Sequence, residues 1–94
     1  MAGAARLHAK AFGWVQGVGF RFFVLARAER HRVTGYVRNE WSGDCVEVVA
    51  EGADGPLRAL LEDVRRGPPG SVVREVEVEW QEATGEFDRF QIRH

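Results

Sequence analysis

The chain has 94 residues, which is enough for one compact domain and too few for two. Its formal net charge is −1, so the composition gives no sign of a nucleic-acid partner. The single Cys45 excludes an intramolecular disulfide, and no segment approaches the roughly 18 apolar residues that cross a bilayer. We therefore expect a single domain over residues 1–94, a cytoplasmic monomer that binds neither nucleic acid nor membrane.

The first half of the chain predicts a strand, a helix and a hairpin. Apolar residues alternate over 6–13, as in a strand with one buried face, and recur at helical spacing over 21–31. Val33–Asn39 is rich in β-branched and aromatic residues and predicts a second strand. Residues 40–44 include Ser42, Gly43 and Asp44, which are typical of turns. Cys45–Ala50 predicts a third strand that pairs with the second.

The second half predicts a helix and two further strands. Asp54 is expected to cap a helix that ends near Gly67. Valines alternate with glutamates over Val72–Trp80, which predicts a strand with one face in the core and one in water. Phe90 and Ile92 repeat this pattern in a short last strand. The order is β-α-β-β-α-β with a terminal strand, an α+β ferredoxin-like sandwich whose two helices cover one face of a mostly antiparallel sheet.

This topology brings two distant residues to one edge of the sheet. Right-handed crossovers make the first and second strands parallel, with the third strand inserted between them. The carboxyl ends of the first two strands then share an edge. Arg21 follows the first strand and Asn39 closes the second, so we expect both at that edge.

The segment between the first strand and the first helix predicts an anion site. Gly17 and Gly19 permit left-handed backbone conformations, so that successive N–H groups can turn inward at the positive end of the helix. Arg21 adds a planar fork of donors that matches a phosphate face. The predicted phosphate-binding residues form one continuous run, which is Val15, Gln16, Gly17, Val18, Gly19, Phe20 and Arg21.

Two segments of the chain resemble the signature segments of the acylphosphatase family. They are VQGVGFR at 15–21 and GYVRN at 35–39. The resemblance continues through 46–52 and 84–92, so it covers almost the whole chain.

The resemblance implies an enzyme that hydrolyses small acyl phosphates to a carboxylate and inorganic phosphate without a cofactor or metal. It implies that Arg21 binds the phosphoryl group with the loop amides and that Asn39 orients the attacking water. The residues themselves agree, because the site contains no metal-ligand cluster, catalytic cysteine or carboxylate pair. A carboxylate departs without a general acid, whereas the alcohol of a phosphomonoester normally needs one.

Two other functions are open to this sequence. One is a non-catalytic acylphosphatase-like module that binds phosphate or carbamoyl phosphate, similar to the amino-terminal domain of the hydrogenase maturation protein. The other is RNA binding, because residues 17–23 superficially resemble an aromatic RNA-recognition motif. That motif belongs on a central strand, whereas residues 17–23 open a helix, so RNA binding is disfavoured.

The sequence departs from the family pattern at four places, one of which is His31, where a leucine is usual. Arg32 stands where a glycine often ends the first helix, so a left-handed residue there is expected to be strained. The turn at 40–44 is longer than the common form. Trp14 replaces a polar residue and is expected to influence the choice of acyl group.

Three more residues are interpreted as structural from the sequence. Trp80 is expected in the core and Arg38 in solvent on the face opposite Asn39. His94 is expected to be isolated from the other histidines and from Cys45, which disfavours a metal or nucleophile role for it.

Overall fold

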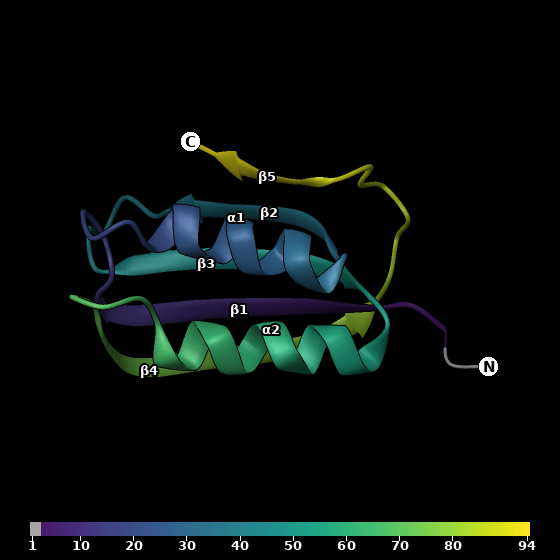
Figure 1. Cartoon of the computed structure of the whole chain (residues 1–94), viewed down its shortest axis with the longest axis horizontal. Coiled ribbons are helices and arrows are strands. Elements are labelled where there is room, and N and C mark those ends of the chain that lie inside the picture. Colours follow the sequence, from purple (N-terminus) through teal and green to yellow (C-terminus); the bar gives the residue numbers. More distant parts are fainter. Residues whose placement is uncertain (1–2) are drawn as a thin grey trace.

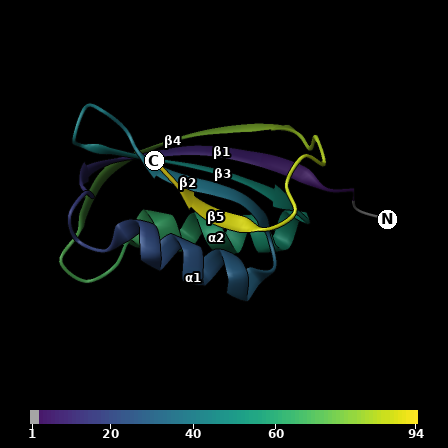
Figure 2. The same cartoon turned by 90° about the horizontal axis from the view of Figure 1, so that it is seen from above.

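The computed structural model describes residues 3–94 as a five-stranded sheet with two helices packed on one of its faces (Figures 1 and 2). The elements follow the predicted order. They are β1 (Ala5–Trp14), α1 (Phe20–His31), β2 (Thr34–Asn39), β3 (Cys45–Gly52), α2 (Asp54–Arg66), β4 (Val72–Glu82) and β5 (Phe90–Arg93). The predicted ferredoxin-like fold is confirmed.

The sheet order is β4-β1-β3-β2-β5. β3 lies between β1 and β2 and runs antiparallel to both, so β1 and β2 are parallel to each other. The short β5 pairs with β2 in the parallel sense. The carboxyl ends of β1 and β2 consequently meet at one edge, on the left of Figure 1, as the sequence predicted.

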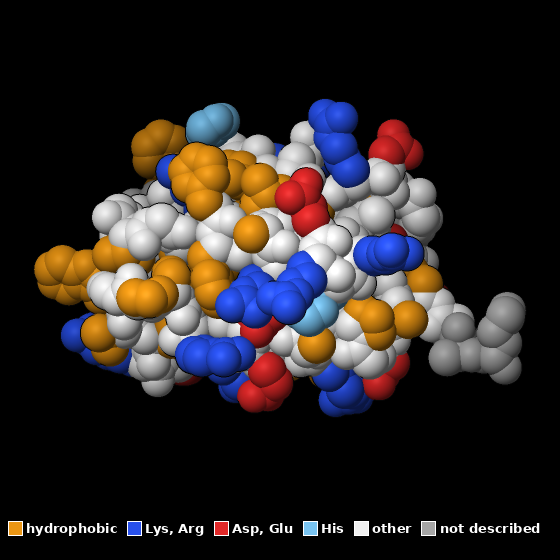
Figure 3. All heavy atoms as spheres, in the orientation of Figure 1, with side chains coloured by type: hydrophobic (Ala, Val, Ile, Leu, Met, Phe, Trp, Pro, Cys, Tyr) orange, Lys and Arg blue, Asp and Glu red, His pale blue; other side chains and the backbone are white. Residues whose placement is uncertain are grey.

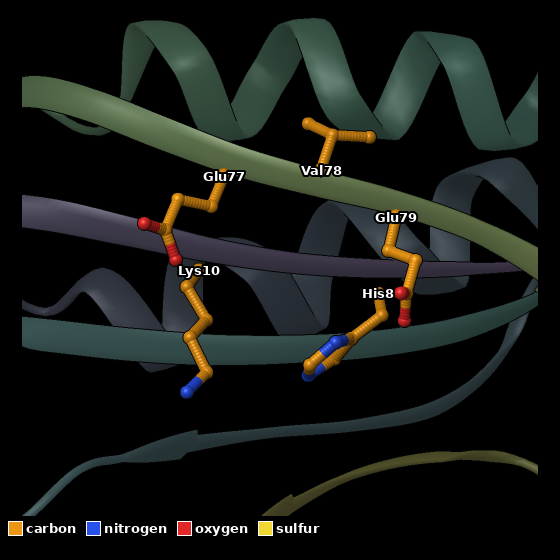
Figure 4. A pocket seen from close by; sticks show the side chains of 5 residues that line it. All are labelled: His8, Lys10, Glu77, Val78 and Glu79. Atoms are coloured by element: carbon orange, nitrogen blue, oxygen red, sulfur yellow. The ribbon is translucent and has the colours of Figure 1, made fainter.

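Alternation along the strands separates an apolar core from a charged open face. Figure 4 shows Val78 pointing toward α2, while His8, Lys10, Glu77 and Glu79 point to the opposite side. The hollow between these side chains is built from charged groups that face water. The core on the helix side is assembled from fully buried apolar side chains, among them Leu7, Val24, Val37, Val46, Val48, Leu57, Leu60 and Val64.

Two predictions about side-chain roles are wrong. The N-cap of α2 is Ala53, without a side-chain cap, and Asp54 lies in the first turn, where its carboxylate accepts a hydrogen bond from Arg58 Nε at 2.9 Å. A carboxylate in the first turn also faces the positive end of the helix. Trp80 is 38% exposed, because β4 is an edge strand, and its ring packs under the Arg58 guanidinium at 4.9 Å.

The buried Glu51 carboxylate holds the connection between β4 and β5. It accepts hydrogen bonds from the Thr84 and Gly85 amides, both at 2.9 Å, and from Arg6 at 3.1 Å. Burial alone would raise the pKa of this carboxyl, but the two amides, the Thr84 hydroxyl and the Arg6 charge outweigh it and hold the pKa below its usual value. This anchor directs the chain back toward β2, where β5 adds the last strand.

Helix α1 ends in a left-handed residue, as expected from the sequence. Arg32 has φ 58° and ψ 43°, and it is the one residue other than glycine with positive φ within residues 3–94. The turn is closed by hydrogen bonds from Arg32 N to Glu29 O and from Val33 N to Ala28 O. The Arg32 side chain is exposed, so its Cβ imposes strain without a compensating contact.

Arg32→Gly should therefore stabilise the protein by about 0.5 to 1 kcal/mol, since glycine adopts this conformation without the Cβ clash. Thermal and urea denaturation measure the change, and we expect the thermal midpoint to rise by about 2 to 8 °C for a chain of this size. Arg32→Ala is the matched control, because alanine removes the side chain and keeps the Cβ. Equal stability of the glycine and alanine variants would show that the left-handed residue carries no strain.

Candidate active site

The loop between β1 and α1 owes its shape to two glycines. Gly17 and Gly19 have φ 75° and 77°, in the left-handed region that favours glycine. A Cβ at either position would meet no atom within 4 Å, so backbone conformation, not crowding, requires glycine here. The predicted loop geometry is therefore present.

The loop leaves its N–H groups without protein acceptors. The first backbone bond of α1 runs from Phe23 N to Gly19 O at 3.0 Å. In the described part of the chain, the backbone amides of residues 17–21 donate to no protein acceptor. Unpaired amides at the positive end of a helix are suited to an anion.

Arg21 is the cation closest in sequence to these amides, and no acidic side chain in the described part of the chain pairs with it. Four arginines are half-buried, and three of them contact carboxylates: Arg6 with Glu86 at 2.7 Å, Arg27 with Asp63 at 4.0 Å and Arg38 with Glu47 at 2.6 Å. Within residues 3–94, Arg21 makes no such ion pair. Its charge is available to an external anion.

Asn39 ends β2 with its side-chain oxygen buried and unsatisfied. Among the described residues, Asn39 Oδ1 has no hydrogen-bond partner. A buried acceptor without a donor is costly in a folded protein, so such an atom needs an explanation. A water molecule or a ligand that donates to Oδ1 would satisfy it.

Arg21 and Asn39 line one open cleft of about 420 Å³ at the edge where β1 and β2 end. Its complete lining is Gln16, Arg21, Arg38, Asn39, Glu40, Trp41 and His94. Hydrophobic side chains gather at this end of the molecule in Figure 3. The large exposed ones near the cleft in sequence are Trp14, Phe22 and Trp41.

Of the predicted phosphate-binding residues that the structure describes, Gln16 and Arg21 are the two that line the cleft. The side chains of Val15 and Phe20 are buried in the core, and Val18 packs against it. Gln16 lines the cleft, but its amide nitrogen donates to two carbonyl oxygens of the β2–β3 turn. Arg21 therefore supplies the charged side chain of the predicted loop.

Sequence reasoning missed four residues of the cleft, which are Arg38, Glu40, Trp41 and His94. Arg38 points to the open face, as predicted, but it is held by Glu47 and still lines the cleft. His94 was expected to lie apart from the other histidines and from Cys45, and its position in the cleft was not predicted. β2 and β5 pair in parallel with Arg38 opposite Arg93, so His94 follows beside Asn39. Trp41 is the fully exposed aromatic at the tip of the turn.

Trp14 does not line this cleft. It is 63% exposed and borders the neighbouring hollow with Gln16, Gly43 and Asp44. Its influence on the acyl group stays a prediction.

Cys45 lies beside the cleft at the start of β3 and is inert. It is fully buried, and burial raises the pKa of its thiol to about 12, with the nearby Glu40 carboxylate adding to the effect. A thiol with such a pKa is not a nucleophile near neutral pH. The described residues contain no group of three or more histidine, cysteine or acidic side chains placed to hold a metal ion.

The acylphosphatase family model matches residues 7–92, with the loop, Arg21 and Asn39 inside the match. The chain belongs to the acylphosphatase family. A protein of Salinibacter ruber named acylphosphatase is 46% identical over 88 residues, which are 94% of this chain and 92% of that protein. The resemblance of the signature segments is thus confirmed.

Solved structures agree with the family assignment. The acylphosphatase of Bacillus subtilis superposes with a TM-score of 0.91 at 34% identity, over 96% of this chain and 99% of that one. HypF of T. kodakarensis matches 94% of this chain with a TM-score of 0.80 at 31% identity, but only 12% of HypF is covered. No helix in residues 3–94 has the length and hydropathy of a membrane span.

Arg21→Lys should weaken binding of inorganic phosphate about tenfold or more, although the charge is kept. A single ammonium group cannot reproduce the planar fork of the guanidinium. Isothermal titration with phosphate measures the effect. Arg30→Lys, on the exposed side of α1, is the matched control and should bind as the parent does. Equal phosphate affinity in both variants would remove Arg21 from the anion site.

Proposed function

We propose that the chain is an acylphosphatase that hydrolyses small acyl phosphates to a carboxylate and inorganic phosphate, with Arg21 and Asn39 as its catalytic residues. The observation that carries the proposal is the cleft. There, an arginine and a buried asparagine oxygen that find no partner among residues 3–94 lie together in a chain of the acylphosphatase family.

In this proposal the loop and Arg21 hold the phosphoryl group. The amides of residues 17–21 and the guanidinium surround its oxygens with donors and positive charge. Charge spreads over these oxygens in the transition state of phosphoryl transfer, so fixed donors stabilise it. The carboxyl end of the substrate then faces the open side of the cleft.

Asn39 orients the attacking water. Its buried Oδ1 accepts a hydrogen bond from the water and directs the water oxygen at phosphorus. A carboxamide cannot take up a proton near neutral pH, so the proton passes to a phosphoryl oxygen of the substrate. The new P–O bond forms as the bond from phosphorus to the carboxyl oxygen breaks, and the electron pair leaves with the carboxylate.

The reaction needs no acid and no covalent intermediate. With a conjugate-acid pKa of about 4 to 5, the carboxylate leaves as a stable anion. The protonated Cys45 thiol offers no nucleophile beside the cleft.

We further propose that residues 1–94 act as one domain, as a cytoplasmic monomer without nucleic acid. The length and near-neutral charge support this. A non-catalytic module is the weaker alternative, because relatives of nearly the same length as this chain carry the name acylphosphatase.

Release of phosphate from an aryl acyl phosphate, with the corresponding aryl phosphomonoester as control, tests the function directly. We expect rapid hydrolysis of the first and none detectable of the second, because the cleft supplies no acid for an alcohol leaving group. Activity should persist after exhaustive treatment with a chelator. Inactivity that a divalent ion restores would overturn the assignment of charge neutralisation to Arg21 and the loop.

Asn39→Ala should lower turnover on the order of 100-fold, or about 3 kcal/mol, since one oriented hydrogen-bonding group is lost from the transition state. Competitive inhibition by phosphate should change only slightly, because the proposed role concerns water. Ser42→Ala, in the exposed turn nearby, is the control and should keep full turnover. Unchanged turnover in Asn39→Ala, with a native circular dichroism spectrum, would make Asn39 a structural strand-end residue.

A further inference from the structure

We propose that Gln16 is a positioning residue that fixes Asn39 relative to the phosphate loop. The inference rests on the proposed function and adds a role for a loop side chain that does not itself need to touch the substrate. It follows from the direction in which the Gln16 side chain points.

The Gln16 amide spans the gap between the loop and the β2–β3 turn. Its Nε2 donates to Glu40 O at 2.8 Å and to Cys45 O at 2.9 Å. Both hydrogens of the amide group are thereby used, so this side chain has no N–H left for a phosphate oxygen.

The two carbonyl oxygens are those that close the hairpin. Glu40 N donates to Cys45 O at 2.9 Å, so Glu40 and Cys45 form the last pair before the turn. Asn39 is the residue immediately before Glu40 and the last of β2. Gln16 is therefore hydrogen-bonded to Glu40, the residue that directly follows the proposed water-orienting Asn39.

The strands also restrain this end of the hairpin, because Lys10 Nζ of β1 contacts Glu40 Oε1 at 3.3 Å and Phe12 of β1 pairs with Cys45. These contacts come from β1 and not from the loop. The four residues at the tip, 41–44, are all exposed. The hydrogen bond from Gly43 N to Glu40 O, at 3.2 Å, joins two residues of the turn and does not connect the turn to the loop. A second link, from Gly13 N to Asp44 O at 3.0 Å, leaves from β1 before the loop begins. In the described chain, the two bonds from Gln16 are the ones that join the loop itself to the turn.

The hydrogen bonds from Gln16 matter because the reaction requires the phosphorus atom and the attacking water to be held at a defined distance from each other. The loop and Arg21 fix where phosphorus lies, and Asn39 fixes where the water lies. A displacement of about 1 Å between reacting groups can cost about 100-fold in rate. By joining the loop to the hairpin, Gln16 restricts movement of Asn39 relative to the phosphate-binding loop.

The experiment compares Gln16→Met with the parent protein. Methionine has a similar length and no donor, so it removes both hydrogen bonds with little change in volume. We expect turnover to fall about 10- to 100-fold, with phosphate inhibition within about twofold of the parent value. The carbonyl ¹³C resonances of Glu40 and Cys45 should shift in the same variant. Gln81→Met, on the exposed edge strand β4, is the matched control and should leave turnover and these resonances unchanged.

A double-mutant cycle with Asn39→Ala decides whether Gln16 acts through Asn39. If it does, Gln16→Met should lower turnover less than about twofold in the Asn39→Ala background, since the side chain that it positions is already absent. Full additivity of the two losses would overturn the inference, as would a parallel loss of phosphate affinity, which would place the effect on the loop.

These outcomes are separable from failure of the proposed function. A parent protein that does not hydrolyse acyl phosphates would refute the function. An active parent whose Gln16→Met variant keeps full turnover would refute the positioning role alone.

Discussion

The insertion of β3 between β1 and β2 is the constraint on which the site depends. β3 is buried along almost its whole length, with Val46 and Val48 in the core and Glu47 and Glu51 in ion pairs on the opposite face. Because β3 runs antiparallel to both neighbours, β1 and β2 must end at the same edge. The loop that follows β1 and the residue that closes β2 are thereby held together by the most deeply buried strand of the sheet.

The site differs electrostatically from the rest of the molecule. Elsewhere, half-buried charges are paired: the Glu47 carboxylate contacts both His8 and Arg38 on the open face, at 2.7 and 2.6 Å. Burial would raise the pKa of Glu47, but its hydrogen bonds with His8 and Arg38 hold that pKa below the usual value. At the cleft, a guanidinium, a set of amides and an amide oxygen have no such partners in the described chain. An acyl phosphate and a water molecule would supply the missing acceptors and the missing donor together.

The sequence predicted the fold and the position of Arg21 and Asn39 at one edge of the sheet, because both rest on local pattern and chain topology. Gly17 and Gly19 predict left-handed backbone conformations in the loop, and the order of elements places Arg21 and Asn39 at one edge of the sheet. The sequence could not predict that His94 lies beside Asn39, since this depends on the parallel register of a four-residue strand paired across more than half the chain. Nor could it predict the exposure of Trp80, because alternation alone does not tell an edge strand from a central one. The direction of the Gln16 side chain was also hidden, because a motif gives identity and spacing but not rotamer.

The small number of groups in the cleft follows from the chemistry that it performs. A carboxylate leaves without a proton, and the substrate's own phosphoryl oxygen can take the proton of the water, so the protein supplies neither an acid nor a base. What remains for the protein is position and fixed charge, which depend on backbone geometry more than on the reactivity of side chains. The proposed phosphate site is formed by two left-handed glycines and a helix end, and the proposed water site by the end of a strand. If the proposed roles hold, a small sheet is sufficient for this reaction, and the hydrogen bonds from Gln16 to the hairpin contribute to the relative position of its two reacting centres.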